Sequence, residues 1–319
     1  MYRIVSILFL VPFGEAAAEP THRLFVTNEA GDSVTVIDTR TDTVEKTLDV
    51  GDRPRGVGFS PNRDRLYVAL GEDNAIGVIN TATLEVERKI QAGSDPEAFA
   101  VHPNGTIYLS NEDEGLASAL DPESGEIKAQ IKVGLEPEGV GVSPDGKQVL
   151  VTSESSNMVH VISVADHKIV ANVLVGARPR EVAFSMDGKH FWVTSEVAGH
   201  VSKVDRAMNR VVLVNRRLRR EVNPRVKPKG IVLSPEGDRL YVSLGRGNAI
   251  AVLDPETLAL QASVPVGVRV WGLALSRDGK RLYAANGPDA TVSVVDTDSL
   301  KEIKTIPTGE MPWGVALDD

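Results

Sequence analysis

The apolar positions of this chain fall into short alternating runs that recur seven times. Leu-Tyr-Val-like triplets begin at residues 24, 66, 107, 149, 191, 240 and 282, so the steps are 42, 41, 42, 42, 49 and 42 residues. Each triplet is followed by a polar turn, a second alternating run, a third run and a Gly-Val run. The runs are bounded by Gly, Pro, Asn or Asp, as is typical of β-strands, and no stretch shows a convincing helical period. This pattern predicts an all-β, seven-bladed β-propeller of four-stranded antiparallel blades.

The repeat is broken at the two ends of the chain in a complementary way. The first strand, in "HRLFVTN", has no Gly-Val strand before it, and the final "MPWGVALDD" is a Gly-Val strand with nothing after it. A ring of blades left open would expose strand edges, which invite aggregation. We therefore expect residues 313–317 to pair with residues 24–28 and close the ring, burying Trp313, Val315 and Leu317.

The first eighteen residues have the layout of a secretory signal peptide. Arg3 precedes an apolar run over residues 4–13, and Ala16, Ala17 and Ala18 provide an A-x-A cleavage site. The apolar run is too short to span a bilayer. The alternative is a buried N-terminal strand. We expect a signal peptide over 1–18, a propeller domain over 19–319, and a periplasmic location.

Composition narrows the classes of chemistry and partner. The 319 residues are 42% hydrophobic but only 5% aromatic, so aliphatic side chains must fill the core, which suits strands. A net charge of -9 argues against nucleic acid as a partner. The chain has no cysteine, which excludes disulfides, thiolate metal sites and cysteine nucleophiles.

Three repeats carry a family resemblance: "LFVTNEAGDSVTVIDT", "LYVALGEDNAIGVINT" and "LYAANGPDATVSVVDT". They resemble the YVTN family of β-propeller repeats, over residues 22–319. With a signal peptide, the chain looks most like the periplasmic propellers associated with pyrroloquinoline-quinone-dependent alcohol catabolism. The resemblance implies a propeller of the Gram-negative periplasm without an established activity of its own. Its partner would be a quinoprotein dehydrogenase, a cytochrome or a transport component.

No catalytic, metal or cofactor motif stands out in the repeats. The six histidines occupy unrelated repeat positions, and no nucleophile elbow or nucleotide-binding glycine loop has a strand–turn–helix setting. A haem-binding Cys-x-x-Cys-His motif is absent, as is the Trp-rich repeat typical of quinone-binding propellers. We therefore predict no catalytic residue, no metal and no cofactor.

The residues that differ between equivalent repeat positions are the candidates for a site. The residue before each Gly-Val strand should lie at the mouth of the central channel, and we call these seven residues the mouth ring: Arg55, Glu97, Glu138, Arg180, Lys229, Trp271 and Trp313. Two positions earlier the chain has much the same order of charges: Arg53, Asp95, Glu136, Arg178, Lys227, Arg269 and Met311. Acidic, basic and aromatic sectors around a ring indicate a patterned docking surface. The alternative is a set of ordinary exposed loop residues.

A second ring is expected on the same face. Its carboxylates are Glu29, Glu72, Glu112, Glu154 and Glu196, followed in the last two repeats by Arg246 and Gly287. We expect adjacent blades to hold them about 8 Å apart, roughly a Debye length. That spacing is too wide for several of them to bind one calcium ion, so steering of a basic partner is the expected use. A repeat-derived solubility feature is the alternative.

One expanded loop breaks the period. Residues 215–230, here called the basic loop, contain seven Arg or Lys residues against one Glu. Arg216, Arg217, Arg219 and Arg220 form its densest part, which favours an acidic partner over a nucleic acid in an exported protein. A flexible solvated loop is the alternative.

Together these features predict a non-enzymatic, monomeric binding or scaffold propeller, accessory to quinoprotein-dependent alcohol oxidation. Two alternatives remain open. One is a lactonase-like hydrolase or redox enzyme with its site at the channel mouth. The other is a cell-surface interaction module.

Overall fold

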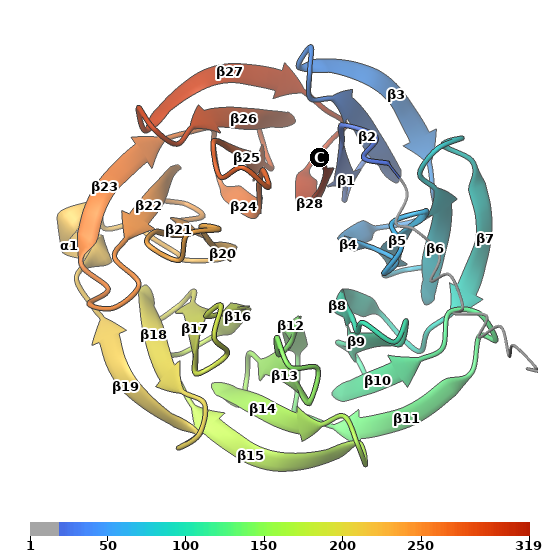
Figure 1. The fold of residues 1–319 in the computed structure, drawn as a ribbon, viewed down its shortest axis with the longest axis horizontal. Helices are drawn as coiled ribbons and strands as arrows, with labels where there is room; N and C mark the ends of the chain where they lie inside the picture. Colours follow the sequence, from blue (N-terminus) through green and yellow to red (C-terminus); the bar gives the residue numbers. More distant parts are fainter. Residues whose placement is uncertain (1–18) are drawn as a thin grey trace, which may run out of the picture.

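The computed structural model describes residues 19–319, which form a ring of seven four-stranded antiparallel sheets (Figure 1). The predicted signal peptide lies outside the described residues. We number the blades by their second strands, so blade 1 consists of β28, β1, β2 and β3, and blade 7 of β24 to β27. The predicted all-β, seven-bladed fold is confirmed.

The two inner strands of each blade come from the most regular segments of the repeat. The innermost strands line the central channel and are β4 (Pro54–Phe59), β8 (Pro96–Val101), β12 (Pro137–Val142), β16 (Pro179–Phe184), β20 (Ile231–Leu233), β24 (Val270–Leu275) and β28 (Pro312–Asp318). The second strands carry the Leu-Tyr-Val triplets and are β1 (Arg23–Asn28), β5 (Arg65–Leu70), β9 (Ile107–Asn111), β13 (Gln148–Ser153), β17 (His190–Ser195), β21 (Leu240–Ser243) and β25 (Arg281–Asn286).

The two outer strands are more polar toward the perimeter. The third strands are β2 (Ser33–Asp38), β6 (Ala75–Asn80), β10 (Leu116–Leu120), β14 (Met158–Ser163), β18 (His200–Asp205), β22 (Ala249–Leu253) and β26 (Thr291–Asp296). The outermost strands are β3 (Thr43–Asp49), β7 (Val86–Gln91), β11 (Ile127–Lys132), β15 (Lys168–Leu174), β19 (Arg210–Asn215), β23 (Leu260–Pro265) and β27 (Lys301–Pro307).

The ring closes as the broken repeat predicts. β28 pairs antiparallel with β1, with Leu24 opposite Leu317 and Val26 opposite Val315. The Asp318 carboxylate accepts hydrogen bonds from the Thr21 backbone N–H at 2.8 Å and from Arg63 Nε at 2.7 Å. The expected burial is only partly correct, because Trp313, Val315 and Leu317 are half-buried: they lie on the innermost strand, where one face looks into the channel.

The hydrophobic core is divided among the seven interfaces between blades. One such cluster joins Phe25 and Val36 of blade 1 to Leu66 and Val68 of blade 2, and another joins Trp192 of blade 5 to Leu240 of blade 6. Because every blade packs on two neighbours, the apolar faces of all sheets are covered. Within residues 19–319, no helix is long or apolar enough to cross a bilayer.

Hydroxyl groups hold neighbouring blades at the height of the mouth ring. In five blades the residue after the apolar triplet donates its hydroxyl hydrogen bond to a mouth-ring carbonyl of the next blade. The pairs are Thr27–Arg55 at 2.7 Å, Ser110–Glu138 at 2.6 Å, Thr152–Arg180 at 2.8 Å, Thr194–Lys229 at 2.6 Å and Ser243–Trp271 at 2.6 Å. Hydrogen bonds from the second strands of neighbouring blades therefore hold the backbone of the mouth ring in place.

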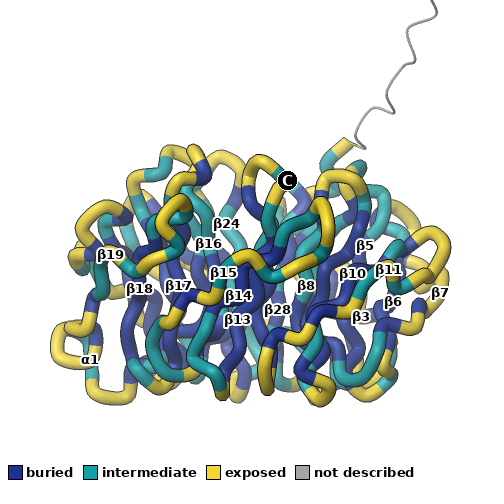
Figure 2. Tube along the Cα trace, turned by 90° about the horizontal axis from the view of Figure 1, so that it is seen from below, coloured by how far each residue is buried: buried dark blue, intermediate teal, exposed yellow. Residues whose placement is uncertain are grey.

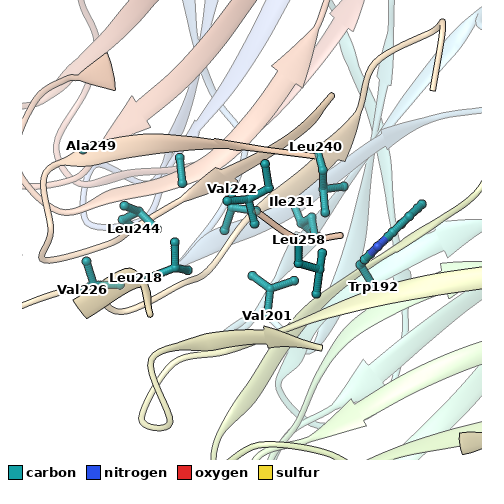
Figure 3. Packing of buried hydrophobic residues seen from close by; sticks show 12 residues of the cluster. Trp192, Val201, Leu218, Val226, Ile231, Leu240, Val242, Leu244, Ala249 and Leu258 are labelled. Atoms are coloured by element: carbon teal, nitrogen blue, oxygen red, sulfur yellow. The ribbon is translucent and has the colours of Figure 1, made fainter. Parts of the chain in front are cut away.

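The expanded repeat contains a short helix that the sequence did not predict. Helix α1 (Leu218–Glu221) lies at the rim of the face opposite the C-terminus (Figure 2). Its Leu218 is fully buried in the cluster between blades 5 and 6, together with Val226 of the same connection (Figure 3). One turn of helix is too short to give a hydrophobic period, so the sequence carries no helical signal there.

Candidate functional site at the channel mouth

The two rings expected on one face do lie together. The residue in the turn after the second strand donates its backbone N–H to the loop that leads into the innermost strand, as in Glu112 to Asp95 at 3.0 Å and Glu154 to Glu136 at 2.9 Å. This face, opposite the C-terminus in Figure 2, is called the mouth face below.

A backbone conformation that recurs from blade to blade orients the side chains of this face. In six of the seven loops, the residue two positions before the mouth ring has a positive φ between 44° and 57°. In several blades its N–H is accepted by an Asp or Asn side chain of the preceding hairpin, as in Arg53 to Asp32 Oδ1 at 3.0 Å and Arg178 to Asn157 Oδ1 at 3.1 Å. The left-handed conformation is uncommon for residues other than glycine. Because this conformation recurs, it belongs to the blade itself, and only the side chains at these positions vary.

The mouth ring is largely buried, so its members are not the ordinary exposed loop residues of the alternative interpretation. Glu97, Glu138, Arg180, Lys229 and Trp271 are buried, and Arg55 and Trp313 are half-buried. The reason is that these side chains point inward across the channel mouth and contact one another. The ring therefore closes the channel and contributes little exposed surface.

The first half of the mouth is an ion-pair cluster of blades 1 to 3. Arg55 contacts Glu29 at 2.6 Å and also Glu97, which is fully buried. Arg53 contacts Asp95 at 2.5 Å, Glu97 at 2.8 Å and Glu112 at 3.5 Å. Two guanidinium groups of blade 2 thus hold four carboxylates from blades 1 and 3.

The second half is centred on Arg180 of blade 5. Its Nη1 lies 2.6 Å from Glu138 Oε1 and also contacts Glu154, and Glu196 lies 3.8 Å away. Lys229 contacts Glu196 at 3.1 Å. Burial and Arg180 lower the pKa of Lys229. Burial would raise the pKa of Glu196, but Lys229 and Arg180 outweigh it and lower that pKa to about 2.

Two tryptophans complete the ring. Trp271 and Trp313 stack with ring centroids 6.0 Å apart and an interplanar angle of 28°. Lys229 Nζ lies 3.5 Å from the Trp271 ring centroid, and Arg55 lies over Trp313 at 6.0 Å. The cations of both ion-pair clusters thus face aromatic rings, a favourable arrangement where water is excluded.

Four members of the second carboxylate ring are paired with arginines: Glu29 and Glu112 share Arg53 and Arg55, Glu154 and Glu196 share Arg178 and Arg180, and Glu72 is the exposed member. One of them, Glu112, has a carboxylate oxygen within 4.8 Å of those of Asp95 and Glu97. These groups are already paired with Arg53 and Arg55, so they are not free to steer a basic partner.

The channel below the ring is narrow. A cavity of about 30 Å³ lies among Glu138, Arg180, Lys229 and the two tryptophans, enough for one or two water molecules. It adjoins a chamber of about 190 Å³ that is lined mainly by innermost-strand glycines and apolar side chains.

Glu181 lines both cavities and is the functional candidate that the sequence reasoning missed. The equivalent residue in the other six blades is small: Gly56, Ala98, Gly139, Gly230, Gly272 and Gly314. Small residues are needed because neighbouring strands approach closely, and a Cβ on Gly139 would lie 2.0 Å from the Arg180 carbonyl oxygen. The sequence signal that could have revealed it is the segment "RPREVAF", which has Glu181 at the position where the other repeats have Gly or Ala. Within residues 19–319, the Glu181 carboxylate has no ion-pair partner, and the Val182 backbone N–H is the hydrogen-bond donor that reaches it.

We expect Glu181 to make stability fall with pH near neutrality. Burial and the Glu138 carboxylate raise the pKa of Glu181 to about 7 from an ordinary value of 4.5. The folded state therefore holds a proton that the unfolded chain has lost between these pH values, so the free energy of unfolding decreases as pH rises through about 7. The loss reaches about 2–3 kcal/mol.

The Glu181→Gln variant checks this expectation. Its unfolding free energy, measured with urea from pH 5 to 8, should lack the decrease and exceed that of the native protein at pH 8. Parallel curves for the two proteins would contradict the assignment.

The basic loop divides into an inner and an outer part. Lys227 and Lys229 turn inward to Glu196, whereas Arg216, Arg217, Arg219 and Arg220 are exposed around the anchored Leu218. The structure thus separates these four arginines from the mouth ring with which the sequence grouped them.

Comparisons with known proteins identify the fold and a domain family. The chain superposes on a functionally unknown protein from Desulfotomaculum acetoxidans with a TM-score of 0.79 and 15% identity, over 93% of this chain and 99% of that one. A candidate 6-phosphogluconolactonase from Bacteroides uniformis gives 0.76 and 19%, over 92% and 98%. Hydrazine synthase of Kuenenia stuttgartiensis gives 0.71 and 21%, over 82% and 88%.

At these identities the likeness concerns the propeller fold alone. No curated protein matches the chain. The profile of the choice-of-anchor I domain matches residues 104–309, which is more than half of the 319 residues. The chain therefore belongs to the choice-of-anchor I domain family.

Proposed function

We propose that this protein is a non-enzymatic binding propeller of the bacterial periplasm, which docks an acidic protein partner on its mouth face. The observation that carries the proposal is the set of four exposed arginines on the anchored α1 connection. Export rests on the signal-peptide layout of residues 1–18. The YVTN resemblance supports a partner from quinoprotein-dependent alcohol oxidation: a dehydrogenase, its cytochrome or a transport component.

The surroundings of the arginines support protein docking. Leu174, at the end of β15, lines one groove with Arg216, and the Val197 carbonyl accepts a hydrogen bond from Arg219 at 2.7 Å; these two apolar side chains are 68% and 49% exposed. Apolar side chains beside arginines are typical of the centre of a protein interface, where charge complementarity speeds association. The buried ion pairs behind this surface keep the blades in fixed relative positions.

The enzyme alternative has one observation in its favour and one against it. Glu181 has a pKa suited to a general acid or base near neutral pH. The cavity beside it at the mouth holds about 30 Å³, and the chamber of about 190 Å³ that it also lines has glycines and apolar side chains for most of its wall, with no second titratable group of the described residues beside Glu181. Protein docking on the exposed arginines of the α1 connection therefore explains the features of this face better than a substrate site does.

Replacing the four arginines should weaken docking. The partner is captured from envelope extract, purified, and titrated against the immobilised residues 19–319. With Arg216, Arg217, Arg219 and Arg220 changed to Ser, we expect at least about a tenfold loss of affinity, mostly through slower association at low salt.

A matched variant controls for net charge. Lys147, Lys189, Arg277 and Lys280 are exposed on turns of the opposite face, and changing them to Ser removes the same charge. This control should bind as the native protein does. Equal losses in both variants, or no loss in either, would overturn docking on the mouth face.

A further inference from the structure

An apolar groove lies beside the basic loop, away from the channel. It has a volume of about 350 Å³ and is formed by the loop after β15 and by strands β18 and β19 of the next blade. Leu174, Val211 and Val214 supply apolar walls, and Arg216 lies at its rim. This volume is within the range of small-molecule sites.

A buried polar atom beside the groove has no partner among residues 19–319. His200 lines the groove with 4% of its surface exposed, and its Nε2 makes no hydrogen bond. Oγ of Ser195 behind it is also buried without a partner, but Ser195 does not line the groove. A Cβ on Gly176 would lie 2.2 Å from His200 Nε2 and 2.7 Å from Ser195 Cβ, so only a glycine fits between them at this point of the groove wall. Buried polar atoms are almost always paired, which points to a ligand.

Comparison with equivalent positions in other blades shows what is missing here. In blade 1 the counterpart of Ser195 is Asn28, whose Nδ2 donates to Ser33 Oγ at 3.1 Å and to Thr35 Oγ1 at 2.9 Å. In blade 7 Asn286 bonds Thr291 and Ser293 in the same way. Those amides bond within their own blades through Nδ2, while Asn28 Oδ1 and Asn286 Oδ1 have no partner among the described residues. Blade 5 has a serine and a histidine at the corresponding positions, and of these two His200 lines the groove.

The electrostatic surroundings favour an anion. Burial, Arg216 and Arg219 lower the pKa of His200 to about 4, so the imidazole is neutral at pH 7 and can donate one N–H. The Arg216 guanidinium supplies positive charge at the rim. Glu196, the nearest carboxylate in the chain sequence, is buried and paired with Lys227 and Lys229.

We propose that this groove binds an aliphatic monocarboxylate. The carboxylate pairs with Arg216 and accepts a hydrogen bond from His200, while the alkyl chain lies along Leu174, Val211 and Val214. Arg216 also belongs to the proposed docking surface, but this site needs no protein partner and is tested without one.

Calorimetric titration of residues 19–319 at pH 7 tests the site with three probes: hexanoate, acetate and hexan-1-ol. Hexanoate should bind one to one and saturate below about 10 mM, with acetate and hexan-1-ol each at least about tenfold weaker, since each lacks one half of the recognition. No saturation by hexanoate, or equal binding of hexan-1-ol, would overturn the proposal.

Two exposed arginines provide a matched pair of variants. Arg216 lines the groove and Arg217 does not. Arg216→Gln should weaken hexanoate about tenfold and Arg217→Gln should leave it unchanged. Imidazole ¹⁵N spectra should show hexanoate shifting His200 and leaving the other histidines in place. Equal weakening in both variants, or an unmoved His200 signal, would show that the groove is not a carboxylate site.

Discussion

Removing the C-terminal strand, residues 312–319, is expected to destabilise the whole propeller strongly. The deletion exposes the edge of β1 and takes away the Trp313 stack and the Asp318 bonds to Thr21 and Arg63. Half-burial of three apolar side chains accounts for about 1–2 kcal/mol each. Their sum is a large part of a typical stability of about 5–15 kcal/mol.

Calorimetry and light scattering measure the outcome. The truncated protein should melt far below the native protein and self-associate through its free edge. Removing Asp319 alone, which leaves the paired strand intact, should change little. A melting temperature within about 2 °C of the native value after the eight-residue deletion would show that β28 does not stabilise the ring.

The fold could be predicted because its information is local and repeated. The period near 42 residues, the alternation of each strand and the Gly, Pro, Asn and Asp boundaries act within a single blade, and each is present seven times. The closure was also predictable, since the half-repeats at residues 22–28 and 312–318 are complementary.

The mouth was harder to predict, because its contacts join residues from different blades. The order of charges around the ring was visible in the sequence. Burial was not: whether Arg180 points outward to solvent or inward to Glu138 and Glu154 depends on how closely seven innermost strands approach. The same closeness makes Glu181 exceptional, and only an aligned column of glycines could have revealed it.

The groove carries a further lesson about repeats. His200 looked uninformative because no other blade had a histidine at a matching position. Its significance comes from its place in the wall of a groove that also contains Arg216, and that placement depends on how blades 4 and 5 pack.

Replacing Arg180 by Gln should be the most destabilising single substitution at the mouth, costing about 3–5 kcal/mol at pH 7. The Arg180 side chain is 7% exposed and contacts the equally buried carboxylates of Glu138 and Glu154. A neutral amide cannot compensate two buried negative charges. Urea unfolding at pH 7 measures the loss.

Two measurements distinguish the loss of charge compensation from a loss of packing at Arg180: the pH dependence of stability and the variant Arg178→Gln. With Arg180 present, the pKa of Glu196 is lowered to about 2, so its contribution to stability is present above its ordinary value of 4.5 and is lost as pH falls through about 2. The difference in unfolding free energy between native and Arg180→Gln proteins should therefore become smaller below about pH 4.5.

Arg178 contacts Glu154 and Glu196 as well, but its side chain is 45% exposed, so Arg178→Gln should cost no more than about 1 kcal/mol. Two outcomes would contradict this account: an equal loss of unfolding free energy in the two variants, or a difference between native and Arg180→Gln proteins that does not change with pH. Either would mean that packing, and not the ion pairs, stabilises the mouth ring.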